Sequence, residues 1–412
     1  MQQNKFIRFM LGAGLCLSVC FALLLGVYDF ILPDRISCHS EADMPDYPLL
    51  CCSSMGDAVC AFSDEVQNNG EDSAPVSAGI ARGEGEFCLL GLLPLKRVEV
   101  AHYTDIRLIP GGMSFGVKLY TDGVLVVGLE EVNSTAGRVN PAADAGIQVK
   151  DVVTHINGTP ITGADAMTAQ IEAAKGCPIT ITYTRDGVPN TVTVTPVADA
   201  VDGRYKTGMW VRDSGAGIGT VTYIEPSTGE FGGLGHGICD TDTGELIPMQ
   251  RGVVMDVTIN GVVRGEVGAP GELKGCFRSF KRGALTKNTT CGVFGVFSSL
   301  PDYASEEVLP IALRSEIQCG PAQIRCTLDE GCPRYYDIEI TSVNKNASGS
   351  KSFVIHVTDP ALLEQTGGIV QGMSGSPIIQ DGKLVGAVTH VLINDPTRGY
   401  GIFIETMLDA AS

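Results

Sequence analysis

The first strong feature of the hydrophobic pattern is an apolar run near the N-terminus. Residues 9–28 carry no charged side chain, and Lys5 and Arg8 precede them. About 20 apolar residues suffice for a helix to cross a bilayer core of roughly 30 Å. Since the positive charges come first, we expect residues 1–8 to stay in the cytoplasm and residues 9–31 to anchor the chain. A cleaved signal peptide is the alternative, but its apolar stretch is normally shorter and an A-x-A-like site follows it.

The next segment, residues 32–88, lacks a steady hydrophobic period. It contains polar, turn-rich stretches such as "EADMPDYP" and "DEVQNNGEDSAPVSAG", which are typical of loops. We therefore expect a linker that is open to proteolysis. Folded structure is expected to begin with the apolar stretch "FCLLGLLPLKRVEVAHY" at residues 87–103.

Residues 105–198 combine strand, turn and helix patterns. "GVLVVGLEEV" predicts a buried strand, and Asn157-Gly158 predicts a turn. In "GADAMTAQIEAAKG" apolar residues recur every three or four positions, which predicts a helix that Gly176 ends. "PITITYTRDGVPNTVTVTP" alternates as a hairpin does around Asp186-Gly187.

This pattern resembles a PDZ domain, above all in the run "AGIQVKDVVTHING". The resemblance implies that a C-terminal or internal peptide binds as an added strand beside the helix. It places the carboxylate-binding loop at Ser114, Phe115, Gly116 and Val117, since glycine lets a ligand approach the backbone closely. An ordinary turn at this place is the alternative.

The remaining residues, 200–412, change character. Short strand-like runs such as "GIGTVTYI", "GVVMDVTI" and "SFVIHVT" follow one another with turn signals between them. Such spacing predicts a β-sandwich or a β-barrel. The fold class is therefore expected to be mainly β, with a transmembrane helix, a PDZ domain and a β-rich third domain.

Composition narrows the function further. The 412 residues carry a formal net charge of −18, which disfavours binding to a phosphate backbone, so no nucleic-acid partner is expected. Among the 14 cysteines, Cys319, Cys326 and Cys332 have a spacing that matches no zinc site. We expect buried thiols with one or two disulfide bridges. No metal or other cofactor is expected.

One short loop carries the strongest chemical signal. "QGMSGSP" at residues 371–377 places two serines among glycines between apolar strands. A nucleophilic serine needs an exposed oxygen, a base and backbone N–H donors for an oxyanion. The motif resembles that of chymotrypsin-like serine peptidases, which implies a double β-barrel. By that resemblance Ser374 is the nucleophile, the N–H groups of Gly372 and Ser374 form the oxyanion hole, and Ser376 occupies the place of a glycine.

A histidine is expected as the base, since its pKa lies near neutral pH. Of the six histidines, His236 lies in the glycine-rich stretch "GEFGGLGHGICD", 138 residues (374 − 236) before Ser374. Glycines around it leave space for a ligand. This separation suits a fold in which one half-barrel supplies His236 and the other supplies Ser374. A turn histidine at a domain edge is the alternative.

The whole chain past the linker resembles the SpoIVB peptidases of endospore-forming bacteria. The resemblance rests on "LIPGGMSFGVKLYTDGVLVVG", "GIGTVTYIEPSTGEFGGLGHGICD" and "QGMSGSPIIQDGKLVGAVTHVLINDPTRGYGIFIE". It implies a membrane-anchored serine endopeptidase that acts in the space between forespore and mother cell. Such a protease releases itself by self-cleavage and cuts a membrane-bound regulatory complex, which triggers sigma-factor processing. A catalytically inactive PDZ adaptor is the alternative.

An acid is expected to orient His236 and to stabilise its charged form. Asp359 ends the apolar run "SFVIHVTDP", so it lies at a strand end between His236 and Ser374 in the chain. The SpoIVB resemblance points to the same residue. Asp256, within a predicted strand, is the second candidate, and a role for Asp359 in capping the following turn is the alternative.

Overall fold

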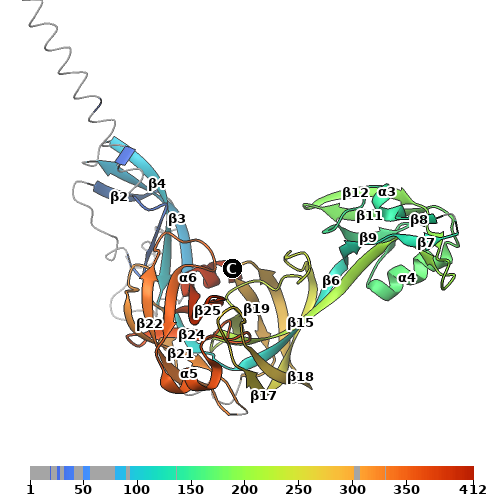
Figure 1. The fold of residues 1–412 in the computed structure, drawn as a ribbon. Helices are drawn as coiled ribbons and strands as arrows, with labels where there is room; N and C mark the ends of the chain where they lie inside the picture. The colour runs from blue at the N-terminus through green and yellow to red at the C-terminus, as the bar shows by residue number, and fades with distance from the viewer. Residues whose placement is uncertain are drawn as a thin grey trace, which may run out of the picture. The chain divides into compact units, whose positions relative to one another are not determined.

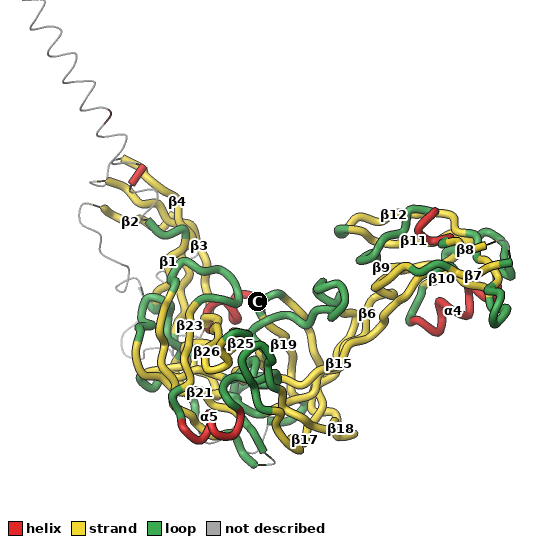
Figure 2. The backbone as a smooth tube through the Cα atoms, viewed as in Figure 1, coloured by secondary structure: helices red, strands yellow, loops and turns green. Residues whose placement is uncertain are grey.

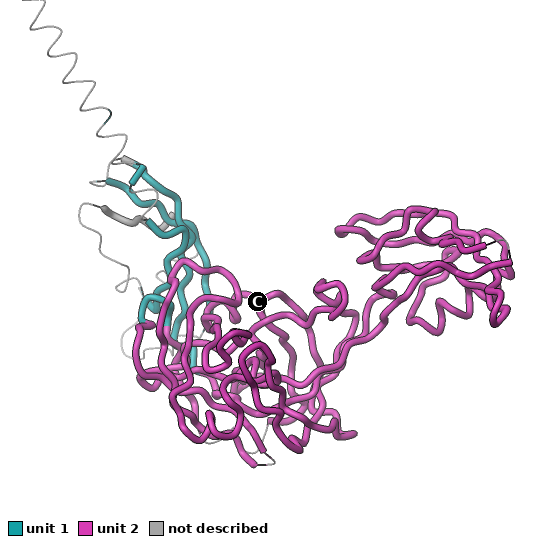
Figure 3. Tube along the Cα trace, viewed as in Figure 1, with its two compact units in different colours: residues 1–107, 313–316 teal, residues 108–312, 317–412 magenta. Residues whose placement is uncertain are grey.

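The computed structural model describes residues 32–40, 50–55, 79–89, 93–135, 137–300, 307–329 and 331–412, together with residues 19, 26 and 27. The predicted anchor lies almost entirely outside these residues, and none of the described helices is long and apolar enough to span a bilayer. Strands dominate the structure (Figure 2), which confirms the mainly β expectation. The chain divides into two compact units, residues 1–107 with 313–316 and residues 108–312 with 317–412 (Figure 3).

The first unit contains a four-stranded sheet in the order β1-β4-β3-β2. Its strands are β1 (Arg35–Cys38), β2 (Leu50–Met55), β3 (Gly79–Leu89) and β4 (Leu93–Thr104). Three of these strands lie in the predicted linker, residues 32–88, so that prediction was wrong there. Strand β3, "GIARGEGEFCL", buries one large side chain, Phe87. Strand β3 forms because it pairs antiparallel with β4. The local sequence does not reveal this long-range pairing.

The second unit begins with a ring of six strands. They follow the order β6-β17-β18-β19-β16-β15, and β15 pairs back with β6 to close the ring. The strands are β6 (Ser114–Leu129), β15 (Met209–Ile224), β16 (Glu230–Gly233), β17 (Met249–Val263), β18 (Glu272–Thr289) and β19 (Gly292–Phe297). Short strands β5 (Arg107–Pro110) and β20 (Leu309–Pro310) extend the sheet from β15. Phe115, Leu119, Phe231, Val254 and Leu285 belong to its buried core.

Strands β6 and β15 are long enough to belong to two bodies (Figure 1). Their far ends pair with each other at Val126 and Val211, and β6 also pairs with β9 there. Between them the chain forms the predicted PDZ region, with its own buried core. The elements are β7 (Val132–Ser134), β8 (Gly137–Val139), α3 (Pro141–Asp144), β9 (Val152–Ile156), β10 (Thr159–Pro160), α4 (Ala164–Ala173), β11 (Ile179–Arg185), β12 (Val188–Val194), β13 (Val197–Ala198) and β14 (Tyr205–Lys206).

The boundaries predicted from sequence, residues 105–198 and 200–412, therefore need correction. Residues 114–121 of the predicted PDZ region pair with β15 and β17 in the six-stranded ring. Conversely, Met209–Arg212 of the predicted peptidase region pair with the PDZ end of β6. The PDZ region is thus inserted into the first barrel and does not precede it. A strand that crosses from one body to another leaves no break in the hydrophobic pattern.

The last part of the chain forms a second closed barrel, in the order β21-β22-β23-β26-β25-β24. Its strands are β21 (Gly320–Cys326), β22 (Arg334–Val343), β23 (Phe353–Val357), β24 (Pro377–Gln380), β25 (Lys383–Leu392) and β26 (Asp395–Phe403). Helices α5 (Pro360–Thr366) and α6 (Ile404–Ala411) follow β23 and β26. Two six-stranded barrels thus supply the two halves of the site described next.

Candidate active site

The loop around Ser374 belongs to the second barrel but is held by β15 of the first. Thr220 donates its N–H to the Ser374 carbonyl (2.9 Å) and its hydroxyl to the Gly372 carbonyl (2.7 Å). The Thr222 hydroxyl donates to the Gly375 carbonyl (2.8 Å). Both threonines are fully buried. These bonds fix the position of Ser374 relative to the first barrel.

Gly375 makes this close approach possible. Its φ of +95° is unfavourable for other residues. A Cβ atom there would lie 2.0 Å from the Thr220 carbonyl oxygen and 2.4 Å from the Leu234 nitrogen. The glycine between the two serines is therefore required by the contact between the barrels as well as by the turn.

The N–H groups expected to form the oxyanion hole have no acceptor among the described residues. Met373, Gly375 and Ser376 donate their N–H groups to backbone carbonyls. Gly372 and Ser374 donate to no group in the part of the chain that the structure describes. Two unused donors that flank a serine hydroxyl are what an oxyanion hole requires.

The two serines of the loop have different surroundings. Ser376 is fully buried, and its hydroxyl donates to the Met373 carbonyl (2.6 Å). Ser374 is partly exposed, and its hydroxyl donates to the Thr389 carbonyl on β25 (2.6 Å). Only the hydroxyl of Ser374 can reach a substrate, since Ser376 is closed off from solvent.

His236 lies in the same region, just after β16. Gly235 packs against Thr389 and Ala387 of β25, and the His236 ring lies 4.9 Å from the His390 ring between centroids. Ser374 thus contacts Thr389, and His236 lies beside His390, the next residue along β25. The described residues contain no hydrogen bond between Ser374 and His236. Such bonds are often formed only once substrate is bound.

The tautomer of His236 follows from the hydrogen bond that its ring makes with Gly237. Its Nδ1 lies 2.8 Å from the carbonyl oxygen of Gly237. Because a carbonyl can only accept, Nδ1 carries the proton and Nε2 keeps its lone pair. Burial lowers the pKa of His236 below its usual value of 6.5, although the Gly237 carbonyl acts in the opposite direction. The ring is therefore a neutral base at pH 7.

The acids proposed from sequence lie elsewhere. The Asp359 carboxylate accepts from the N–H groups of Ala361 (2.9 Å) and Leu362 (3.0 Å), so it caps α5. Asp256 forms an ion pair with Arg282 (2.6 Å). Within the described chain no carboxylate bonds to His236. In this structure Asp359 takes the capping role that the sequence offered as the alternative, since an Asp before Pro at a strand end is also the signature of a helix N-cap. Its role as the acid that orients His236 stays a prediction.

The predicted carboxylate-binding loop is not a loop. Ser114, Phe115, Gly116 and Val117 form the start of β6 and are all buried in the first barrel. A Cβ atom on Gly116 would lie 2.2 Å from the ring of Phe277. The glycine therefore makes room for a side chain of the barrel and not for a peptide ligand.

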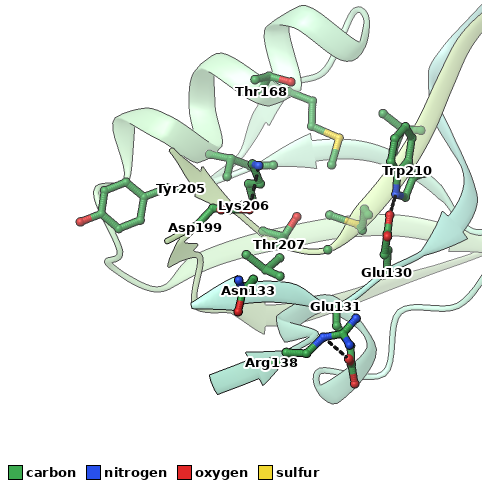
Figure 4. Close-up of a pocket in the computed structure, with 16 residues that line it drawn as sticks. Glu130, Glu131, Asn133, Arg138, Thr168, Asp199, Tyr205, Lys206, Thr207 and Trp210 are labelled. Carbon is green, nitrogen blue, oxygen red and sulfur yellow. Dashed lines mark hydrogen bonds and ion pairs between the residues drawn. The ribbon is translucent and has the colours of Figure 1, made fainter. Parts of the chain in front are cut away.

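The PDZ region has a groove elsewhere, with a volume of about 700 Å³ (Figure 4). One side is formed by α4, through Met167, Thr168 and Ile171, and another by residues 205–211. Met209–Arg212 pair with β6 on one edge, and among the described strands none pairs with their other edge. Sequence reasoning missed this segment because it comes after the recognised PDZ pattern.

Comparison with known proteins agrees with this arrangement. Residues 203–408, half of the chain, match the family described as SpoIVB peptidase S55. Residues 111–195 match the PDZ domain family, a range that includes the barrel part of β6. No curated protein sequence matches the chain significantly.

Three solved structures are similar to parts of the chain. The PDZ domain of the SdrC-like protein from Listeria monocytogenes is 21% identical over 22% of this chain and 87% of its own, with a TM-score of 0.18. The HtrA-type protease AlgW with tripeptide is 12% identical over 47% of this chain and 54% of its own (TM-score 0.28). The Rv3671c protease from M. tuberculosis, active form, is 12% identical over 47% and 72% (TM-score 0.25).

The lowered pKa of His236 gives a pH prediction. The base must be unprotonated, so activity is lost as pH falls through its pKa. Since burial lowers that pKa, the rate of labelling by a fluorophosphonate probe should stay high at pH 6.5 and decline only below it. Labelling rates across pH 4–9 measure this, and a half-maximal point at or above pH 6.5 would contradict it.

The cap formed by Asp359 gives a second prediction. Asp359→Ala should lower the free energy of unfolding by about 0.5–2 kcal/mol, the usual cost of a lost cap. Asp359→Asn should keep the cap, since asparagine caps helices equally well. If the cap is the only role of Asp359, both variants label at nearly the wild-type rate. An orienting acid behaves differently, because its replacement by Asn costs on the order of 10⁴ in turnover, so slow labelling of a folded Asp359→Asn variant would restore the catalytic role.

Proposed function

Because the chain belongs to the SpoIVB peptidase S55 family, which makes it a serine endopeptidase, we propose that it is a self-cleaving signalling protease of sporulation. Residues 9–31 anchor it in the membrane, and its peptidase domain acts outside the cytoplasm, between forespore and mother cell. Its substrates are the chain itself and the extracytoplasmic part of a membrane-bound regulatory complex. Cutting that complex triggers sigma-factor processing.

The site supports peptide-bond hydrolysis through one observation above all: the N–H groups of Gly372 and Ser374, which have no acceptor among the described residues, flank a partly exposed serine hydroxyl. An inactive adaptor would have no use for two unpaired donors beside a neutral histidine. The alternative of a PDZ adaptor without catalysis is therefore the weaker account.

The chemistry follows from the same groups. The Ser374 hydroxyl leaves the Thr389 carbonyl, and its oxygen forms a bond to the substrate carbonyl carbon. Its proton passes to Nε2 of His236, which becomes an imidazolium. The carbonyl oxygen gains negative charge and accepts hydrogen bonds from Gly372 and Ser374. His236 then gives the proton to the leaving amine, and water releases the acyl group by the same route.

Self-cleavage is proposed between residues 32 and 88. A protease cleft takes its substrate as an extended strand, so residues that are already paired in a sheet must first be released. The paired residues of β1, β2 and β3 are therefore poor substrates. The polar stretch "DEVQNNGEDSAPVSA", residues 64–78, lies between β2 and β3 in the sequence, and we propose that the cut falls there.

Substrate selection is proposed to use the PDZ groove. The free edge of Met209–Arg212 can accept a peptide as an added strand, with side chains lying against α4. Glu130, Glu131 and Asp199 also line the groove, together with Arg138 and Lys206. Lys206 forms an ion pair with Asp199 (2.9 Å), and Arg138 forms one with Glu131 (3.0 Å). Because these charges already have partners within the groove, we propose that backbone hydrogen bonds contribute more to peptide binding than charge does.

Loss of the nucleophile should stop processing. Ser374→Ala should leave the chain intact and unlabelled by a fluorophosphonate, while the wild type gives a fragment whose N-terminus lies between residues 56 and 78. N-terminal sequencing of both purified chains measures this. Ser376→Ala is the matched control and should still label, since its hydroxyl bonds only to Met373. A wild type that labels fully but never shortens would contradict self-cleavage and leave the peptidase activity in place.

Blocking the groove should slow processing without affecting the site. Thr168→Trp places a large ring on the groove side of α4, whereas Ala169→Trp, also exposed, places it outside the groove lining. Thr168→Trp should slow self-processing at least about tenfold and leave fluorophosphonate labelling unchanged, and Ala169→Trp should change neither. Equal processing by both variants would contradict a role for this groove.

A further inference from the structure

Strand β18 carries a charge opposite to that of the chain as a whole. Its 18 residues include five cations and one acid, Glu272, whereas the whole chain has a formal net charge of −18. Two of the cations are already engaged, since Arg282 forms an ion pair with Asp256 (2.6 Å) and Lys287 donates to backbone carbonyls at the C-terminus. The other three are exposed: Lys274, Arg278 and Lys281.

These three cations keep the capacity to bind a ligand. Lys274 lies 3.9 Å from Glu272, at the limit of an ion pair, and both side chains are more than half exposed. Arg278 donates one N–H to the hydroxyl of Thr258 (2.5 Å), which is a neutral acceptor. Lys281 forms no ion pair with any residue that the structure describes. A guanidinium has five N–H donors and an ammonium three, so each side chain can still bind a carboxylate.

A bulge moves the middle of β18 outward. The partners Met255 and Val257 on β17 are two residues apart, whereas the residues they pair with on β18, Lys281 and Phe277, are four apart (281 − 277). The extra residues of such a bulge are redirected out of the ladder. All of them are exposed, and Phe280 presents a ring that is 61% exposed.

The edge of β18 that faces away from β17 is open where these cations lie. Strand β19 pairs with β18 only from Gly283 onward, and at the other end Glu272 is bridged to Gln371. None of the described strands pairs with residues 274–281 on this edge. Lysines and bulges also protect free edges from aggregation, but protection does not call for exposed phenylalanine rings.

This edge continues from the loop of the nucleophile. Leu273 donates its N–H to the Gln371 carbonyl (2.8 Å), and Gln371 donates its N–H to the Gly271 carbonyl (2.8 Å). A Cβ atom on Gly372 would lie 3.0 Å from the Cβ atom of Leu273. Since Gly372 carries one of the N–H groups expected in the oxyanion hole, a peptide that pairs with residues 274–281 lies beside the site of hydrolysis.

We propose that Lys274, Arg278, Lys281 and Phe280 form a docking site for acidic peptide segments, called the basic strip below. The peptide adds as a strand to the free edge of β18, as peptides do at exposed sheet edges elsewhere. Its carboxylates meet the three cations, and the ring of Phe280 covers an apolar side chain. The occupant during self-cleavage is the segment of residues 64–78 of this chain.

Charge complementarity identifies this occupant. Residues 64–78 contain no cation and four acids: Asp64, Glu65, Glu71 and Asp72. Opposite charges across an interface select partners and speed association. The inference rests on the proposed self-cleavage and adds the substrate class, which is extended peptide rich in Asp and Glu. An anionic membrane surface has the same sign of charge, but it offers no backbone groups to a strand edge.

The test measures kcat/KM on two synthetic peptides, one with the sequence of residues 61–80 and one with its four acids replaced by Asn and Gln. Each enzyme is used once its own processing is complete, so that no tethered segment competes. The strip variant carries Lys274→Gln, Arg278→Gln and Lys281→Gln. The matched control loses three exposed cations of the second barrel, Arg334→Gln, Lys345→Gln and Arg398→Gln. Fluorophosphonate labelling and thermal unfolding report an intact nucleophile and fold.

We expect the strip variant to lose roughly 5- to 30-fold in kcat/KM on the acidic peptide, mainly through a higher KM, which is the combined effect of three exposed ion pairs. On the neutral peptide it should match the wild type within about twofold, and the control should match it on both peptides. Raising the salt concentration to about 0.5 M should remove most of the difference, because exposed charges are then screened. Lys281→Gln alone should lose about two- to threefold.

Two results would overturn the basic strip and leave the self-cleavage site in place. One is equal kcat/KM of the wild type and the folded strip variant on the acidic peptide; if the strip variant also lost binding to phosphatidylglycerol vesicles, the cations would be assigned to a membrane surface. The other is an equal loss in the strip variant and its control, which would show an effect of net charge alone. A wild type that labels but neither shortens nor cuts the acidic peptide would instead overturn the self-cleavage site and its occupant together.

Discussion

The catalytic arrangement depends on one contact, the pair of hydrogen bonds from Thr220 to the carbonyls of Ser374 and Gly372. The proposed nucleophile, Ser374, comes from the second barrel and the proposed base, His236, from the first, so neither barrel would have a site alone. Thr220 and its neighbour Thr222 are fully buried, and a buried hydroxyl that lost its acceptor would carry an uncompensated cost of about 1–3 kcal/mol. These hydrogen bonds therefore hold the two barrels in a fixed position relative to each other.

The same region of the structure fixes the tautomer of His236 through a backbone carbonyl. A carbonyl can set the tautomer of His236 as strictly as an acid can, since it only accepts. It stabilises the imidazolium less, because it contributes a dipole and no net charge. Lowering the pKa of the base by burial keeps it unprotonated at neutral pH but makes its protonation harder.

Local signals predicted the local features well. Asn157 and Asp186 adopt the positive φ angles that their turns require, α4 lies within the predicted helix, and glycines pointed to the segments that carry Ser374 and His236. Long-range features were missed. The residues of β6 do not indicate that Ser114–Val117 pair with β15 and β17, because those strands come much later in the sequence. Asp359 shows a further limit, because one sequence signature serves both a strand end and a helix cap.

The insertion of the PDZ region between β6 and β15 also determines the order in which the protein can fold. Tyr120 and Ser214, which pair in the ring where β6 and β15 leave it, are separated by 94 residues (214 − 120). Closing a flexible loop of that length costs about 4 kcal/mol in chain entropy. A folded PDZ region removes most of this cost, because it already holds the ends of β6 and β15 paired. The PDZ region can therefore serve as a folding template for the first barrel, and a ribosome completes it before the strands β15 to β19 that close the ring.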